Sequence, residues 1–198
     1  MQRLMIVVLC LTAGVCFAAR KERVKVGGCG KVAVVNASAV STNALKSAAD
    51  KLANFMMVDI EVVKGEWSLK DAKKGLEATG ANAAVFVIDD KTMPMSLIAM
   101  EEKWGMANAN GLDEKSVEKE LLRVMTVVIG GASSKYEASV MRPVFSKADL
   151  EKKAGDIVTF DSIMAIFGYL PDLGIKPYKM MSRELAIEKG LIKADQAK

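Results

Sequence analysis

The 198-residue chain contains no histidine, so it lacks the side chain that most often binds zinc or acts as a general base near neutral pH. It has three cysteines, and two of them, Cys10 and Cys16, lie in an apolar N-terminal run. Removal of that run leaves only Cys29, which excludes an intramolecular disulfide. With no histidine to activate it, we interpret Cys29 as an incidental thiol in a glycine-rich segment.

Charge of one sign is not concentrated anywhere in the chain. The 28 Lys and Arg residues and 24 Asp and Glu residues are interleaved, and the net charge is +4. Gly30 and Lys31 do not form a phosphate-binding loop, because they precede a predicted strand instead of following one. Basic and aromatic residues do not alternate either, so nucleic acid is not predicted as a partner.

The longest apolar run lies at the N-terminus. Arg3 precedes residues 4–17, a run too short to span a bilayer as a permanent helix. Cys16 and Ala18 are small residues at the two positions that a signal peptidase reads. We predict a signal peptide over residues 1–18, cleaved after Ala18, which leaves no transmembrane anchor and exports the protein to the periplasm or the medium. The alternative is a lipoprotein signal at Cys16, but the residue before it is valine.

Three segments beyond residue 30 have the pattern of strands. Residues 31–36 and 83–88 are apolar runs typical of buried strands, and residues 58–62 alternate as in a half-buried strand. One helical pattern follows residues 31–36, and another follows residues 58–62. Two helices that each join one strand to the next predict crossover connections and a mainly parallel, twisted sheet. Residues 96–100 and 104–108 are interpreted as a hairpin-like pair at the sheet edge. The predicted fold class is therefore α/β.

The two crossover helices have clear start signals. Ser41 or Thr42 caps the first, while Ser68 and Asp71 have the spacing of a capping box for the second, which Gly80 ends. The predicted inward-facing residues are Leu45, Ala48, Ala49 and Leu52 in the first helix, and Leu69, Ala72 and Leu76 in the second.

A long amphipathic helix after the hairpin is predicted to organise the rest of the domain. Asp113 is its N-cap, and Gly130 and Gly131 can adopt the backbone conformation that ends a helix. One face of the helix is apolar and belongs in a core. The residues of this face are Val117, Leu121, Val124, Met125 and Val128.

The spacing from this helix to Met141 resembles the active-site signature of the metzincin metallopeptidases, most closely the archaemetzincin type. In that family a helix carries His-Glu-x-x-His, a glycine turn follows, a third histidine completes the zinc site, and a methionine turn lies beneath it. The family's glycine matches Gly130 and its turn methionine matches Met141. This register places Arg123 and Val127 at the first two zinc ligands, Val124 at the general base and Ser133 at the third ligand.

None of these side chains provides a donor that zinc sites use. A second register matches residues 119–123 to His-Glu-x-x-His and keeps Glu120 as the base, but it puts Thr126 at the glycine and leaves Met141 too distant. The archaemetzincin pattern also has a structural zinc site of four cysteines. The matching positions here are Ser134, Ser139, Thr159 and Ser162. The resemblance therefore implies a metzincin-like fold with a degenerate, zinc-less site and no cofactor. The alternative is that this helix is a core helix of an unrelated α/β protein.

Arg123 has two interpretations. If the geometry of the family's site survives, the guanidinium could enter the former zinc cleft and pair with a carboxylate or hold an anionic ligand. The interpretation that we favour is a cation on the exposed side of the helix.

The predicted organisation is a signal peptide (1–18), a flexible linker (19–30), one metzincin-like domain (31–192) and a tail (193–198). The domain has an upper half, residues 31–132, and a lower half, residues 133–192, which is a small helical C-terminal subdomain. Start signals for its helices are Ser146 with Asp149, Asp161 for a helix to Leu170, and Ser182 for a helix to Lys189.

The sequence favours an exported, non-catalytic pseudo-peptidase that binds an extended peptide or protein by strand addition around residues 96–108. The alternative is a metal-independent hydrolase with a re-equipped cleft around Arg123. The sequence identifies neither the partner nor the oligomeric state.

Overall fold

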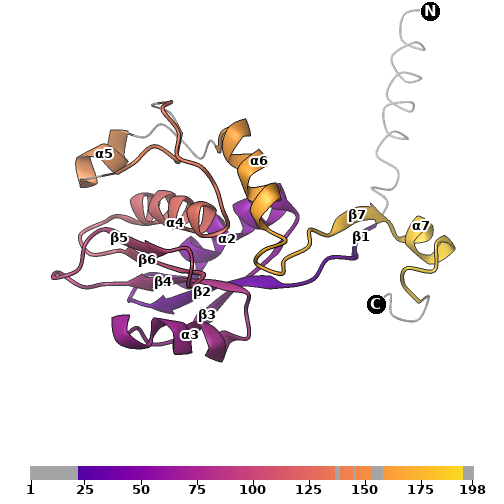
Figure 1. Cartoon of the computed structure of the whole chain (residues 1–198), viewed down its shortest axis with the longest axis horizontal. Coiled ribbons are helices and arrows are strands. Elements are labelled where there is room, and N and C mark those ends of the chain that lie inside the picture. The colour runs from indigo at the N-terminus through magenta and orange to yellow at the C-terminus, as the bar shows by residue number, and fades with distance from the viewer. Residues whose placement is uncertain (1–21, 137–138, 145, 153–157, 194–198) are drawn as a thin grey trace, which may run out of the picture. The chain divides into compact units, whose positions relative to one another are not determined.

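The computed structural model describes residues 22–136, 139–144, 146–152 and 158–193 (Figure 1). The predicted signal peptide and residues 194–198 of the predicted tail lie outside this part of the chain. The described residues form two compact units. One comprises residues 28–178, and the other comprises the described parts of 1–27 and 179–198.

The larger unit is built on a five-stranded sheet in the order β3-β2-β4-β6-β5 (Figure 1). Strands β2 (Lys31–Ala37), β3 (Asp59–Lys64), β4 (Ala83–Ile88) and β6 (Trp104–Asn108) are parallel. Strand β5 (Ser96–Ala99) is antiparallel to β6 and forms one edge. The predicted mainly parallel sheet with an antiparallel edge hairpin is confirmed, and β4 lies at its centre.

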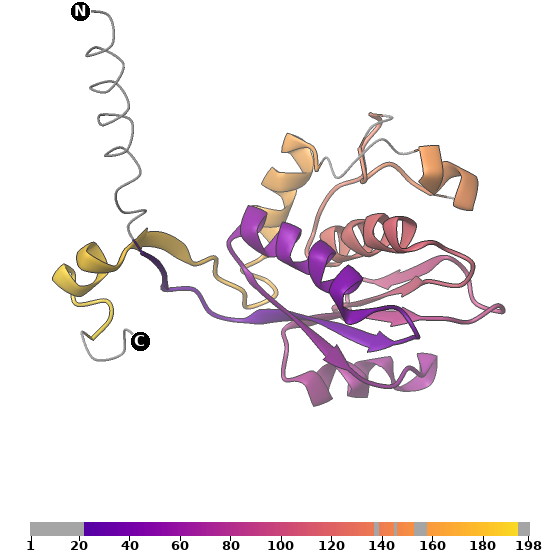
Figure 2. The ribbon, with the colours of Figure 1, turned by 180° about the vertical axis from the view of Figure 1, so that it is seen from behind.

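Helices cover both faces of this sheet (Figure 2). Helix α2 (Thr42–Met56) connects β2 to β3, and α4 (Glu114–Val128) follows β6 on the same face, whereas α3 (Ala72–Thr79) connects β3 to β4 across the opposite face. Ser41 caps α2 as predicted, since its Oγ accepts from the N–H of Ala44 at 3.3 Å. The four predicted inward-facing residues of α2 are buried.

The predicted capping box of α3 does not form. Residues Leu69–Asp71 make a 3-10 turn, η1, and the α-helix begins only at Ala72. Ser68 Oγ donates to the Asp71 carboxylate at 3.3 Å and caps no backbone N–H. Gly80 ends the helix with a positive φ of 61°, as predicted.

Leu69 was expected to face inward, and this prediction is wrong: its side chain is 50% exposed. Trp67 covers this end of the sheet instead, with its ring centroid 4.9 Å from that of Phe86. Leu69 lies in the 3-10 turn beside it. Ala72 and Leu76 are buried as expected.

Helix α4 begins and ends as the sequence predicts. Asp113 accepts from the N–H of Ser116 at 2.7 Å. At the other end the N–H of Gly130 donates to Val127 O and the N–H of Gly131 to Thr126 O, the two hydrogen bonds of a Schellman motif. Gly130 has a φ of 98°, which disfavours any other residue. All five residues of the predicted apolar face are buried.

Two short helices follow in the larger unit. Ser146 starts α5 (Lys147–Lys152) as predicted, because its Oγ accepts from the N–H of Asp149 at 3.2 Å. Helix α6 (Phe160–Tyr169) begins two residues earlier than predicted, with Thr159 at the N-cap position. The prediction that Asp161 caps this helix is therefore wrong, and Asp161 lies in its first turn.

The smaller unit contains a strand pair that the sequence analysis missed. Strand β1 (Arg23–Val26) is antiparallel to β7 (Lys179–Ser182), and helix α7 (Arg183–Glu188) follows, capped as predicted by Ser182. Residues 23–26 are thus a strand and not flexible linker. Pairing of segments so distant in sequence leaves no local signal. Within the described part of the chain, no helix is long and apolar enough to cross a membrane.

Asp113→Ala should lower the free energy of unfolding by a pH-dependent amount. The N–H of Ser116 holds the pKa of Asp113 below its ordinary value of 3.8. The charged cap therefore stabilises the fold above that ordinary value, and this stabilisation is lost as the pH falls through the lowered pKa. Urea unfolding should show a difference between wild type and variant that shrinks in acid. A constant difference would mean that the carboxylate charge does not contribute.

Candidate functional site

Helix α4 approaches the sheet so closely that β6 has a glycine at the contact. A Cβ on Gly105 would lie 2.8 Å from Val124 Cγ1 and 2.7 Å from Val128 Cγ2. Both valines are fully buried. Val124, at the position of the general base in the first register, therefore packs against β6 and does not face an open cleft.

Arg123 forms a buried ion pair on the same helix. Its Nε donates to Oε2 of Glu120 at 2.9 Å, and Nη2 donates to Oε1 of the same carboxylate. Nη2 also donates to Ser96 Oγ, on strand β5, at 2.5 Å. The side chains of Glu120 and Arg123 are 1% and 11% exposed. This pair therefore connects helix α4 to the edge strand.

The prediction of an exposed cation at Arg123 is wrong. Both oxygens of Glu120 accept from the guanidinium, and this two-point geometry suits arginine and not lysine. Glu120, the general base in the second register, is thus held by a permanent cation.

The other positions of the first register have different surroundings. Val127 is half-buried on α4, and Ser133 is exposed in the segment after the helix. Gly130 lies against Tyr169 of α6, where a Cβ would overlap the tyrosine side chain. The hydroxyl of Tyr169 donates to Met100 O at 3.3 Å, near the end of β5.

Met141 is held in the core by two of the serines that the resemblance matches to structural-zinc positions. Its N–H donates to Ser139 Oγ and its carbonyl accepts from the N–H of Ser134, each at 3.1 Å. The Met141 side chain is buried among the apolar residues of α4 and α2. Met141 is therefore a buried residue that follows α4 in the chain.

The other two residues that the resemblance matches to structural-zinc positions contact each other. Thr159 Oγ1 and Ser162 Oγ lie 3.0 Å apart. Ser162 Oγ donates to Ala132 O at 2.6 Å and so ties the start of α6 to the chain just before Ser134. Hydroxyls thus hold these segments together by hydrogen bonds.

The residues at the two expected zinc sites do not fit zinc. Arginine repels a divalent cation, valine has no donor atom, and neutral hydroxyls are not the ligands of structural zinc. Among the described residues, no group of three or more His, Cys, Asp or Glu side chains is placed to share a metal ion.

Among the described residues, strand β5 pairs with β6 alone and forms one edge of the five-stranded sheet. The N–H of Asn108 donates to Met95 O at 2.8 Å, and the register pairs Leu97 with Met106. Because peptide groups alternate in an antiparallel pair, the N–H and C=O groups of Ser96 and Ile98 point away from β6. These groups can accept an added strand.

Sequence reasoning missed Glu120 and Ser96 as the partners of Arg123. The spacing of three residues between Glu120 and Arg123 is a recognisable helical pairing signal. Ser96 gave no such signal, because its contact with Arg123 depends on how β5 crosses the helix.

No protein-family profile and no curated protein sequence matches the chain. Solved structures, in contrast, do match the fold of the chain. The archaemetzincin from Methanopyrus kandleri superposes with a TM-score of 0.57 at 10% identity, covering 72% of this chain and 96% of that one. A zinc-dependent peptidase from Methanocorpusculum labreanum superposes with a TM-score of 0.53 at 7% identity, covering 68% and 99%. The chain has a metzincin-like fold of the archaemetzincin type, and at these identities the similarity concerns the fold alone.

Removing either partner of the buried pair should be strongly destabilising. Glu120→Gln and Arg123→Met should each cost about 3 kcal/mol or more of unfolding free energy, because the remaining group stays buried without its counter-charge. The double variant should recover part of this loss. Denaturant unfolding measures all three.

A matched control is Glu118→Gln on the same helix. Glu118 pairs with Lys51 at 2.7 Å, and the Lys51 side chain is 41% exposed. Such a pair contributes at most about 1 kcal/mol. If the Glu120 and Arg123 variants lose no more than this control, the buried pair does not stabilise the fold.

Proposed function

We propose that this protein is an exported, non-catalytic pseudo-peptidase that binds an extended peptide or protein segment along strand β5. The observation that carries the proposal is the open edge of β5, where the peptide groups of Ser96 and Ile98 face outward. An added strand gains its main-chain hydrogen bonds from such an edge.

The buried ion pair supports this proposal by keeping the edge strand in place. Arg123 donates to Ser96 Oγ, so the binding edge is tied to the core helix through Glu120. Pre-organisation of this kind reduces the entropy cost of binding. The contact of Arg123 with Ser96 thus has a structural role. The outward-facing peptide groups of β5 are the groups that would bind a ligand.

The chemistry of the former active site supports a non-catalytic role. The first register places arginine, valine and serine at the zinc ligands and valine at the base. In the second register Glu120 is bound on both oxygens by Arg123. Hydrolysis needs an activated nucleophile and a free base, and neither register supplies them.

If a peptide binds by strand addition, every second backbone N–H of the peptide should face β5. A peptide selected from an immobilised random library should lose binding when alternate backbone nitrogens are methylated, and keep it when the intervening ones are methylated. On the protein, Ile98→Pro removes an outward N–H without removing a bond to β6. We expect at least about a tenfold loss of affinity, measured by fluorescence polarisation.

Ile98→Val is the matched control, since it keeps both the N–H and a β-branched side chain. Circular dichroism should show that both variants fold. The proposal is wrong if Ile98→Pro binds the selected peptide as tightly as Ile98→Val, or if methylation has the same effect at every position.

The alternative is a metal-independent hydrolase around Arg123. A screen of the purified protein against peptide and ester substrates, with Arg123→Lys as the variant, distinguishes the two proposals. We expect no turnover by either protein. Turnover by the wild type that Arg123→Lys loses would favour the hydrolase, because lysine keeps the charge but not the two-point geometry.

Export is the remaining part of the proposal, and it rests on Arg3, the apolar run of residues 4–17 and Ala18. The protein recovered from outside the cytoplasm should begin at Ala19 by N-terminal sequencing. Recovery of the intact chain with Met1 from the cytoplasm would contradict export.

A further inference from the structure

Helix α6 presents large apolar side chains to solvent. Phe160, Met164 and Phe167 are 72%, 55% and 44% exposed. Their spacing of four and then three residues places them on one face of the helix. On the opposite face, Ile166 is fully buried in the core of the larger unit. A helix that is apolar on both sides is normally covered on both sides.

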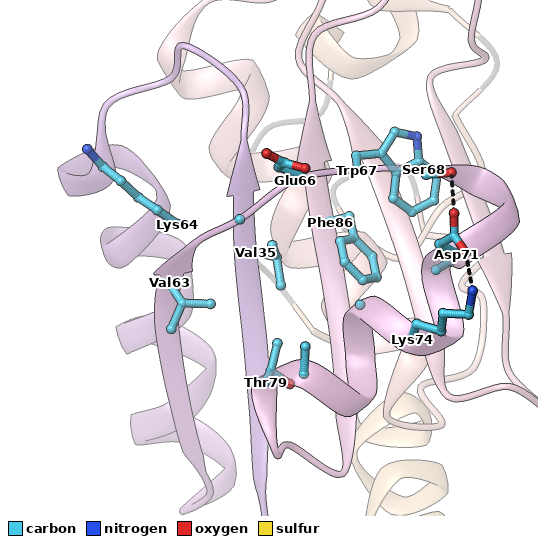
Figure 3. A pocket seen from close by; sticks show the side chains of 14 residues that line it. Val35, Val63, Lys64, Glu66, Trp67, Ser68, Asp71, Lys74, Thr79 and Phe86 are labelled. Carbon is cyan, nitrogen blue, oxygen red and sulfur yellow. Dashed lines mark hydrogen bonds and ion pairs between the residues drawn. The ribbon is translucent and has the colours of Figure 1, made fainter.

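The apolar surfaces of the central sheet are covered by the chain itself. On the α3 face, residues 64–68 form a strap that brings Trp67 onto Phe86, which is buried (Figure 3). On the other face, α2 and α4 bury their apolar sides. In contrast, Phe160 of α6 is the most exposed large apolar residue in the described part of the chain. The solvent face of α6 is therefore a candidate interaction surface.

Gly168 lies on this exposed face, four residues after Met164. A glycine inside a helix costs about 1 kcal/mol relative to alanine. Where the fold needs a glycine, as at Gly105, a neighbouring side chain such as Val124 fills the space of the missing Cβ. A Cβ on Gly168 would meet no described atom within 4 Å. Packing within the described chain therefore does not explain this glycine, whereas close approach of another molecule would.

The charges around α6 favour a protein over a lipid surface. Helices that lie on membranes carry lysine and arginine beside their apolar face. Residues 158–175, which include α6, contain Asp161 and Asp172 but no lysine or arginine. Aromatic residues and methionine, without basic neighbours, are typical of the core of a protein–protein contact.

We propose that the solvent face of α6 is the contact between two copies of this chain, with the two α6 helices packed antiparallel about a two-fold axis. An axis beside Met164 brings the residues four before it and four after it to the same height. Phe160 of one copy then enters a hole formed by Met164, Phe167 and Gly168 of the other, as a knob enters a hole in a coiled coil. The symmetry makes this contact twice. The missing side chain of Gly168 provides the room for the ring.

The area of this surface is that of a weak dimer. A fully exposed aromatic side chain presents about 150–250 Å², so the exposed fractions of the three α6 residues amount to roughly 300–400 Å². Phe55 of α2 extends the surface, because it lines one hollow together with Val158, two residues before α6. A standard interface buries about 800 Å² on each partner, and smaller ones are transient. We expect a dissociation constant of about 1–100 µM.

Sedimentation velocity over about 1–200 µM protein measures this equilibrium. Gly168→Leu adds apolar surface and helix propensity but fills the hole that receives Phe160. It should weaken the dimer at least about tenfold, whereas unspecific apolar association would become stronger. Ala78→Leu makes a similar change at an exposed position of α3 and should dimerise as the wild type does. Circular dichroism should show that both variants fold.

Disulfide cross-linking locates the two-fold axis. The chain's three cysteines are first replaced by alanine. In this background, Met164→Cys should form a disulfide between copies at least about tenfold faster than Leu69→Cys, because only position 164 faces its own copy. Leu69 is a suitable control, since its side chain is similarly exposed and lies in η1.

Three results would overturn this contact: a monomer at every concentration, a Gly168→Leu dimer as tight as that of Ala78→Leu, or cross-linking at position 164 no faster than at position 69. A monomer that sediments with phosphatidylcholine–phosphatidylglycerol vesicles would assign the face of α6 to a membrane instead. No peptide is present in these measurements, so they are independent of the proposed peptide binding at β5.

Discussion

The close packing of helix α4 against the sheet is the interaction on which the rest of the larger unit depends. Val124 and Val128 occupy the space that a side chain on Gly105 would take, so helix and strand meet without a gap. One turn of the same helix carries the Glu120–Arg123 pair, which reaches Ser96 and positions the edge strand. Apolar contact and one buried ion pair thus fix the same helix to two adjacent strands.

Side chains at the positions that the resemblance matches to zinc ligands connect the elements around helix α4. A metal ion bridges helix and loop through its ligands. Here Arg123 joins α4 to β5, while hydroxyls hold the segments around Met141 and α6. The proposed binding role uses the edge strand that these contacts hold in place.

The two faces of the sheet are covered by different elements. Helices α2 and α4, each of 15 residues, bury their apolar faces over one side. The other side has α3, of eight residues, together with the strap that brings Trp67 onto Phe86. Val35 and Phe86 are nevertheless buried on this side, at 3% and 1% exposed.

The sequence by itself determined the elements whose signals are local. Periodicity located the strands and helices of the sheet, Asp113 and the Gly130 turn bounded α4, and the absence of histidine excluded an imidazole-based zinc site. Tertiary structure alone decided the burial of Arg123, the exposure of Leu69 and the pairing of β1 with β7. Local signals arise from neighbours along the chain, whereas burial and strand pairing depend on residues that are distant in sequence and meet only on folding.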